Sequence, residues 1–228
     1  MTSNPGTARD LRPQEFGRLK PHDIGDPLIE PLWIGRRMLA HVSDRQAELV
    51  DDRGDLVDAG GTIEAVAAAV ASESAVLDGY LTVQALKATV GVYTGDTMPK
   101  ISASDVARQM FIGGGGNRLM ALADSRESLL SKPDEDEIDA AFVAVDLLVI
   151  DGEPLLDVPL LERKRLLESI FVEGPLTRLG IHVKPPIASW LSTWRAAGFQ
   201  SLAWKHANSR YRPGERNDDW AVGPIPRR

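Results

Sequence analysis

Three stretches of the chain carry the spacing of hydrophobic and polar residues that is typical of strands. A nearly continuous apolar run over residues 141–152, AFVAVDLLVIDG, predicts a strand that is buried on both faces. Residues 47–58, AELVDDRGDLVD, follow an apolar and basic stretch and alternate around an Asp-Arg-Gly turn, which predicts a β-hairpin. Residues 74–86, SAVLDGYLTVQAL, predict another strand with a bulge or turn at Asp-Gly.

Helical spacing alternates with these strand patterns. Residues 62–74 are rich in alanine and begin with Thr62, a residue type that caps helix N-termini. We therefore expect a helix of about three turns there, with Thr62 as its N-cap. Leucines near one face predict a second helix over residues 159–172, and an amphipathic pattern predicts a third over residues 186–199. Short strands are expected over residues 179–185 and 199–206 and at Trp220. Strands interleaved with helices, hairpins included, indicate an α+β domain.

The composition is that of an ordinary globular protein and excludes several kinds of site. Of 228 residues, 43% are hydrophobic and 26% are charged, and the formal net charge is -7. That acidic balance argues against a surface built throughout for nucleic acid, because Lys and Arg supply most affinity for phosphates. The chain has no cysteine, and its four histidines lack the short spacing of a metal site, so no metal centre is expected.

The ends and the middle of the chain lack these patterns. We expect residues 1–26 to be a flexible N-terminal arm, residues 27–222 to form one domain, and residues 223–228 to be a tail. Within the domain, residues 93–139 are divergent, with four consecutive glycines at Gly113–Gly116 and an acidic loop. No run reaches the roughly 20 apolar residues that span a bilayer, and the N-terminus has no secretory pattern, which predicts a cytoplasmic protein without membrane contact.

Three segments resemble, in order, the adenylation (nucleotidyltransferase) domain of ATP-dependent DNA ligases. Residues 145–168, VDLLVIDGEPLLDVPLLERKRLLE, resemble a strand, turn and helix of that family. Residues 205–220, KHANSRYRPGERNDDW, resemble its Lys … Ser-x-Tyr-x-Pro-Gly-x-Arg motif. Residues 30–37, EPLWIGRR, match its Glu-Pro-Lys-x-Asp-Gly-x-Arg motif at four positions. The resemblance implies an ATP-grasp-like α+β fold in which antiparallel sheets pack against helices.

The same resemblance implies that the residues that perform adenylation are replaced. Leu32 stands where the family has the nucleophilic lysine, and Ile34 replaces an aspartate. Tyr80 replaces a glutamate, and Val145 replaces a base-stacking phenylalanine. The last motif, Trp-x-Lys-x-Lys, has lost both lysines, at Val222 and Pro224. A leucine has no lone pair with which to attack a phosphate, so no lysyl-AMP is expected at that position.

The expected function is therefore that of a catalytically inactive ligase-like protein, a pseudoenzyme. The chain ends eight residues after Trp220, so we expect it to lack the OB-fold domain of the family. It would act as a binding or assembly scaffold that contacts a protein partner or a second copy, with a link to DNA repair through the family. No cofactor is expected, and ATP and magnesium would bind only if residual affinity survives.

Two alternatives remain open. In the first, the protein binds a nucleotide or a nucleic-acid end without catalysis. Candidates for contact with a nucleotide or phosphate are Arg37, Arg53, Lys205 and Arg216. Candidates for contact with nucleic acid are Arg210, Tyr211 and Arg212. In the second alternative, the chain is a divergent ligase or nucleotidyltransferase that a partner completes.

Two tryptophans are candidates for an interaction surface. Trp190 and Trp194 are spaced i and i+4 and therefore share one face of the helix expected over residues 186–199. If they are exposed, they predict a docking surface. Packing in the core is the alternative.

Overall fold

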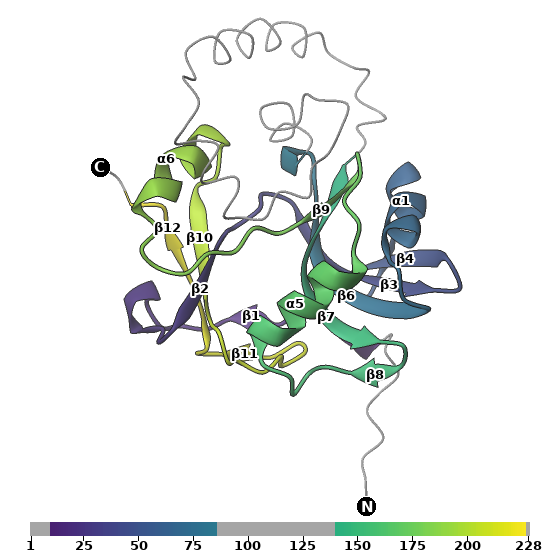
Figure 1. Ribbon diagram of the computed structural model, residues 1–228, viewed down its shortest axis with the longest axis horizontal. Helices are drawn as coiled ribbons and strands as arrows, with labels where there is room; N and C mark the ends of the chain where they lie inside the picture. The colour runs from purple at the N-terminus through teal and green to yellow at the C-terminus, as the bar shows by residue number, and fades with distance from the viewer. Residues whose placement is uncertain (1–9, 86–139, 227–228) are drawn as a thin grey trace, which may run out of the picture.

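A computed structural model describes residues 10–85 and 140–226 of the chain, as two larger sheets, a two-stranded pair and three α-helices (Figure 1). The larger sheet has seven strands in the order β5-β4-β3-β6-β7-β8, with β9 beside β7. Every pair in it is antiparallel except β7 with β9. Its strands are β3 (Arg36–Ser43), β4 (Gln46–Asp51), β5 (Leu56–Val57), β6 (Ser74–Thr82), β7 (Ala141–Ile150), β8 (Glu153–Pro154) and β9 (Thr177–Leu179).

The strand patterns predicted for the larger sheet are confirmed in most details. β7 is buried along its first eight residues, as its apolar run predicts. The expected Asp-Arg-Gly turn joins β4 to β5, where the carboxylate of Asp51 accepts N–H donors from Arg53, Gly54 and Asp55. A second turn, at Asp44 and Arg45, joins β3 to β4.

Two helices cover one face of the larger sheet. α1 (Gly61–Ala69) and α5 (Leu160–Ile170) contribute to a core cluster that also contains Met38, Leu77 and Phe142. Thr62 is not the N-cap of α1, as expected from the sequence, because Gly60 holds that position. Thr62 is buried instead, and its hydroxyl donates to the carbonyl of Ala140 across the sheet.

The smaller sheet has three antiparallel strands in the order β12-β10-β2. They are β2 (Pro27–Pro31), β10 (Ser201–His206) and β12 (Trp220–Pro224), and α6 (Ala188–Ala196) packs with them. The strand expected over residues 179–185 is wrong: β9 ends at Leu179, and only Val183 forms a bridge, to Ile29. The chain crosses there from the larger sheet to the smaller one.

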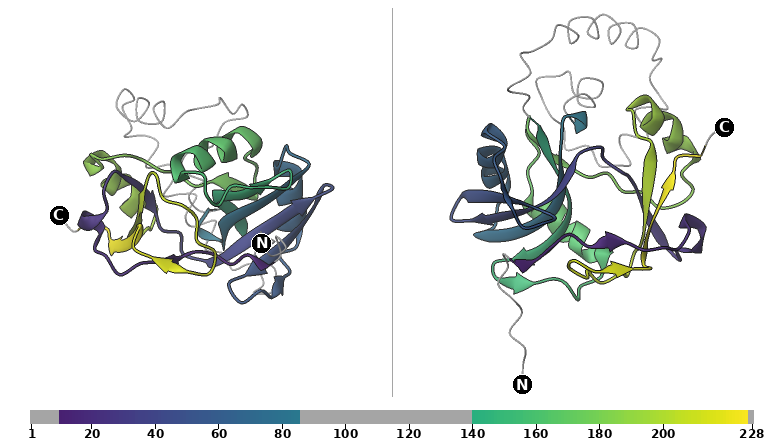
Figure 2. Two further views of the ribbon diagram at one scale, coloured as in Figure 1. Left: turned by 90° about the horizontal axis from the view of Figure 1, so that it is seen from below. Right: turned by 180° about the vertical axis from the view of Figure 1, so that it is seen from behind.

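The N-terminal segment is packed rather than loose, which corrects the expectation for residues 10–26. β1 (Glu15–Phe16) pairs in parallel with β11 (Arg216–Asn217) and lies between the two sheets in Figures 1 and 2. A short 3-10 helix, η2 (Pro21–Asp23), follows it. Gln14 is fully buried because its backbone and side chain bond to the domain.

The C-terminal boundary also differs from the expectation of a tail from residue 223. β12 continues to Pro224, and Ile225 is buried.

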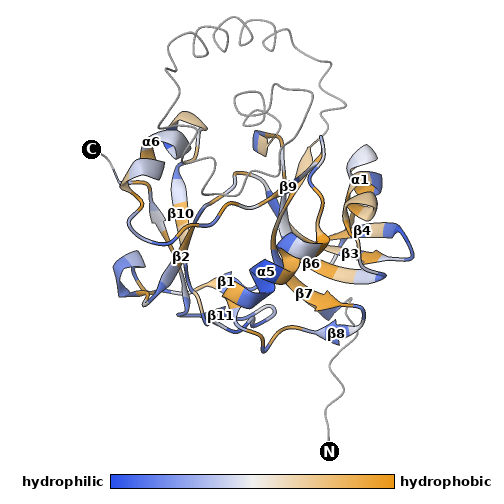
Figure 3. Ribbon diagram, in the orientation of Figure 1, coloured by the Kyte–Doolittle hydropathy of each residue, from blue (hydrophilic) through white to orange (hydrophobic). Residues whose placement is uncertain are grey.

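Gly113–Gly116 and the acidic loop lie outside the described residues. No helix among residues 10–85 and 140–226 is both long and apolar enough to cross a membrane. Figure 3 shows hydrophobic residues concentrated on the strands of both sheets and polar ones at the turns.

Candidate functional site

A buried carboxylate of the smaller sheet binds two lysines, one from the same sheet and one from the helix α5 beside the larger sheet. Glu30 of β2 lies 2.7 Å from the amine of Lys164 on α5 and 2.9 Å from the amine of Lys205 on β10. All three side chains are less than a tenth exposed. Lys164 also donates to the carbonyl of Val145 on β7. We call Glu30, Lys164 and Lys205 the Glu30 centre.

The charges of the Glu30 centre are unbalanced, since two ammonium groups share one carboxylate. Burial raises the pKa of Glu30, but Lys164 and Lys205 outweigh it and lower that pKa to about 2. Burial is also the largest influence on Lys205 and lowers its pKa. His182 lies at the edge of the centre, where burial and the charge of Lys164 lower its pKa to about 4. A neutral imidazole therefore borders a cationic centre.

A second buried network surrounds Arg37 of β3. Its guanidinium binds both carboxylate oxygens of Asp78 on β6, at 3.0 and 2.5 Å, and also donates to the carbonyl of Gln14. The hydroxyl of Tyr211 donates to Asp78 at 2.8 Å and accepts from the backbone N–H of Gln14. Burial and the nearby Asp78 raise the pKa of Tyr211 well above its ordinary value. We call this group the Arg37 network.

A further buried ion pair is formed by α5 and β7, and one tryptophan connects the Glu30 centre to the Arg37 network. Arg163 of α5 binds both oxygens of Asp146 on β7, at 2.9 and 2.8 Å, and both side chains are fully buried. Trp220 of β12 lies under two cations: the amine of Lys205 is 4.4 Å from its ring centroid, and the guanidinium carbon of Arg37 is 5.7 Å away. Such contacts stabilise desolvated cations.

Three of the positions at which sequence analysis expects replaced ligase residues lie together in an apolar cluster. Tyr80 and Val145 are buried members of one hydrophobic cluster with Trp33, Val143 and Trp194 as neighbours, and Leu32 packs against it. Burial raises the pKa of Tyr80 to about 12, so its phenol is neutral at physiological pH. We call this group the apolar cluster.

The remaining replaced positions are exposed. Ile34 is 54% exposed and Val222 is 41% exposed, and Pro224 is exposed as well. Between Ile34 and the retained arginine, Gly35 has a structural reason to be glycine. A Cβ at that position would collide with the carbonyl of Leu81 and the side chain of Thr82 on β6.

The predicted binding residues divide into a buried set and an exposed set. Arg37, Lys205 and Tyr211 come together around Trp220. Tyr211 is fully buried and Lys205 is 2% exposed, which corrects the expectation that Tyr211 is available to stack on a base and the alternative that Lys205 is solvated. The exposed set comprises Arg53, Arg210, Arg212 and Arg216. Of these, Arg216 pairs with Glu15 at 2.9 Å and Arg212 approaches Asp157 at 3.9 Å.

The tryptophans of α6 do not form an exposed interaction surface. Trp194 is 2% exposed, and its ring stacks with that of Trp190 at 5.8 Å between centroids. Trp190 is partly buried against the apolar cluster. Packing in the core, the alternative to a docking surface, is therefore the correct interpretation of the pair.

Sequence reasoning missed Lys164, Arg163 and Gln14. The helical spacing contained a signal for the first two, because Arg163 and Lys164 lie between Leu160 and Leu167 at steps of three and four residues, on the buried face of α5. No comparable pattern marks Gln14, whose bonds reach residues almost 200 positions away in the chain.

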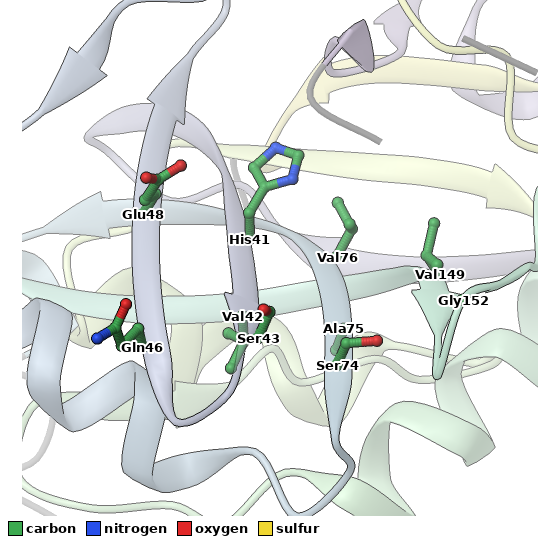
Figure 4. A pocket seen from close by; sticks show the side chains of 10 residues that line it. All are labelled: His41, Val42, Ser43, Gln46, Glu48, Ser74, Ala75, Val76, Val149 and Gly152. Carbon is green, nitrogen blue, oxygen red and sulfur yellow. The ribbon is translucent and has the colours of Figure 1, made fainter. Parts of the chain in front are cut away.

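The described residues contain no cluster of histidine and carboxylate side chains that could hold a metal ion. Two hollows lie elsewhere on the larger sheet. One, of about 310 Å³, is bordered by His41, Glu48, Val76 and Val149 and is shown in Figure 4. The other, of about 830 Å³, lies between the β3–β4 turn and α1.

Comparison with known proteins identifies the family. The family model described as the ATP dependent DNA ligase domain matches residues 24–221. The chain is 32% identical over 85 residues to a DNA ligase of Natronomonas pharaonis, and 35% identical over 79 residues to one of Thermococcus onnurineus. These matches cover 37% and 33% of this chain but only 16% and 14% of the two ligases.

Solved structures show the same fold. The ligase domain of M. tuberculosis LigD has a TM-score of 0.62 and 21% identity, and the match covers 93% of this chain and 59% of that one. Chlorella virus DNA ligase-adenylate has a TM-score of 0.51 and 11% identity, with 91% and 63% covered. The α+β arrangement of antiparallel sheets and helices is thus that of the ligase nucleotidyltransferase domain. This chain belongs to the ATP-dependent DNA ligase family, within which it corresponds to the adenylation domain.

Proposed function

We propose that this adenylation domain does not form a covalent AMP intermediate and serves as a non-catalytic binding or assembly scaffold, associated with DNA repair through its family. The observation that carries the proposal is the apolar cluster. Leu32, Tyr80 and Val145 are replaced relative to the family motifs, and all three lie in or against that one cluster. Three apolar replacements that pack together favour a conversion from a ligand site to a packed core.

The lysines of the Glu30 centre do not offer a substitute nucleophile. Attack on a phosphate requires a neutral amine with a free lone pair. The amines of Lys164 and Lys205 are each bonded to Glu30, and Lys164 also donates to a backbone carbonyl. Both hydrogen-bond as donors, so that neither amine has a lone pair directed at a ligand, although burial lowers the pKa of Lys205.

The residues present also fit magnesium ATP poorly. A phenol such as Tyr80, with a pKa of about 12, is a weak ligand for a divalent cation at neutral pH. The carboxylates of Asp78 and Asp146 are each bound by a guanidinium through both oxygens. The last-motif positions, Val222 and Pro224, supply no charge for a triphosphate.

Intact-mass measurement after incubation with ATP and magnesium tests the proposal, with the ligase domain of M. tuberculosis LigD treated identically as the positive control. We expect no mass gain in this protein. A gain of one AMP would overturn the proposal. Calorimetric titration of the same sample with ATP reports binding without chemistry, and measurable heat with no mass gain would favour nucleotide binding as the retained activity.

A second candidate, binding of a nucleic-acid end, is favoured by the exposed arginines. Arg53 and Arg210 are exposed, on the turn between β4 and β5 and on the loop between β10 and β11. Binding through phosphates should weaken steeply with salt. Retention of nicked duplex DNA at low salt, reduced by Arg53→Ala with Arg210→Ala but not by Arg45→Ala, would support this candidate. Absence of retention at low salt would remove it.

A further inference from the structure

The larger of the two hollows is a groove between a rigid turn and the end of a helix. It is lined by Asp44 and Arg45 of the β3–β4 turn and by the last part of α1 and the residues that follow it, up to Glu73. Asp44 and Arg45 both have positive φ, at 53° and 60°, as in the tight two-residue turns that match the twist of paired strands. One wall of the groove is therefore preorganised.

The floor of the groove is apolar and made of small side chains, namely Val42, Ala67, Ala68, Val70 and Ala71. Ala68 and Ala71 are exposed. Beside Val70, the backbone N–H of Val172 donates to the carbonyl of Ala69, and the side chain of Val172 is 62% exposed. At about 830 Å³ the groove is within the size range of sites that hold small ligands or short peptide segments.

The charges around this floor are predominantly negative. Three carboxylate residues, Asp44, Glu64 and Glu73, line the groove together with one basic residue, Arg45. Among residues 10–85 and 140–226, none of these carboxylates forms an ion pair with a basic side chain. The carbonyl end of α1 adds negative potential from the helix dipole, and its last turn contains no basic residue.

We propose that this groove docks a basic segment of a partner protein, in which lysine or arginine side chains alternate with small apolar ones. The basic groups would meet the carboxylates and the carbonyl end of α1, while the small side chains would rest on the alanines. Complementary charge of this kind selects partners and speeds association. A bound divalent cation fits less well, because the described carboxylates do not cluster closely enough to hold a metal.

This inference gives the proposed scaffold its docking surface and rests on that function, yet it can fail separately. A chain that gains AMP mass but binds a basic peptide would overturn the scaffold proposal alone. A chain that gains no AMP and binds no such peptide would overturn the groove alone.

The test uses the full chain and a short fluorescein-labelled peptide that alternates lysine and alanine, with binding followed by fluorescence anisotropy at low salt. We expect Glu64→Gln with Glu73→Gln to weaken binding about tenfold, since two exposed charge contacts are removed. Ala68→Trp should weaken it at least as much by filling the groove. The matched control, Glu153→Gln with Glu215→Gln, removes two exposed charges outside the groove and should leave the affinity unchanged.

Three results would overturn the proposal. One is the absence of peptide binding, and another is equal weakening by the control pair, which would indicate attraction to the overall negative charge. The third is a dimer in light scattering that dissociates on Ala68→Trp, because the occupant would then be a second copy of this chain. Circular dichroism and the unfolding temperature of each variant verify that the fold is intact.

Discussion

The space between the two sheets contains two regions of opposite character. The apolar cluster contains Leu32, Tyr80 and Val145, three of the positions on which the proposed loss of adenylation rests. The Glu30 centre and the Arg37 network consist of charged residues, and each of these charges is bonded to another part of this chain. The first region is packed by apolar contacts, whereas the second is held together by internal ion pairs.

Removing the carboxylate of Glu30 should have the largest effect on stability. Glu30→Gln leaves two buried ammonium groups without a counter-ion, and breaking a buried ion pair costs about 3–5 kcal/mol. We expect a decrease of that size in the free energy of unfolding, measured by urea denaturation. The control Glu162→Gln breaks only the exposed pair with Arg165 and should cost less than about 1 kcal/mol. Equal effects would show that the Glu30 centre does not join the sheets.

Introducing a carboxylate into the apolar cluster should lower the free energy of unfolding without producing adenylation. Tyr80→Glu buries an acid in the apolar cluster, close to the carboxylates of Asp78 and Glu30 as well as to Arg37. We expect a loss of about 3 kcal/mol at neutral pH in urea denaturation, because the charged form is desolvated. Tyr80→Phe keeps the ring and should change stability by less than about 1 kcal/mol. If Leu32→Lys with Tyr80→Glu gained one AMP in intact-mass measurements, the cluster would still be a functioning pocket.

Lowering the pH should reduce the free energy of unfolding in two steps, one from His182 and one from Glu30. His182 has a folded pKa of about 4 against an ordinary 6.5, so its unfolded form gains a proton first and stability falls as the pH drops from 6.5 to 4. Glu30, at about 2 against 4.5, extends the loss to lower pH. We expect about 3 kcal/mol from His182. In urea midpoints measured against pH, His182→Asn should remove the upper step; an unchanged profile would contradict its assignment.

The smallest effect is expected at an exposed pair. Arg216→Ala removes the contact with Glu15, and both side chains are about half exposed. Such pairs contribute on the order of 0.5 kcal/mol, so the thermal unfolding temperature should barely change. A large decrease would mean that the pairing of β1 with β11 depends on this contact.

Local spacing was sufficient to predict much of the fold, because strand and helix patterns are set by neighbours in sequence. The apolar run of β7 and the turn after β4 are examples. The packing of Gln14 and the course of residues 180–184 could not be predicted, since both depend on contacts with distant parts of the chain. For Lys164 the helical spacing places it on a buried face, but only the fold reveals its partner, Glu30.

The candidate site was predictable in its residue types and not in their accessibility. Arg37 and Lys205, two candidates for contact with a nucleotide, both lie beside Trp220, yet the sequence did not indicate that each is paired with a buried carboxylate of this chain. A basic residue in a sequence has the same letter whether it faces solvent or an internal carboxylate. Burial of Tyr211 and Trp194 likewise arises from packing that no local pattern encodes.

The pairing of β1 with β11 has a consequence for synthesis of the protein. Glu15 and Arg216 are 201 positions apart, and Gln14 depends on Tyr211 and Arg212 in the same way. During translation β1 therefore lacks its partner until the segment that contains Arg216 has left the ribosome. Pairing between such distant segments slows folding and leaves the nascent β1 segment open to chaperones or wrong pairings until β11 emerges.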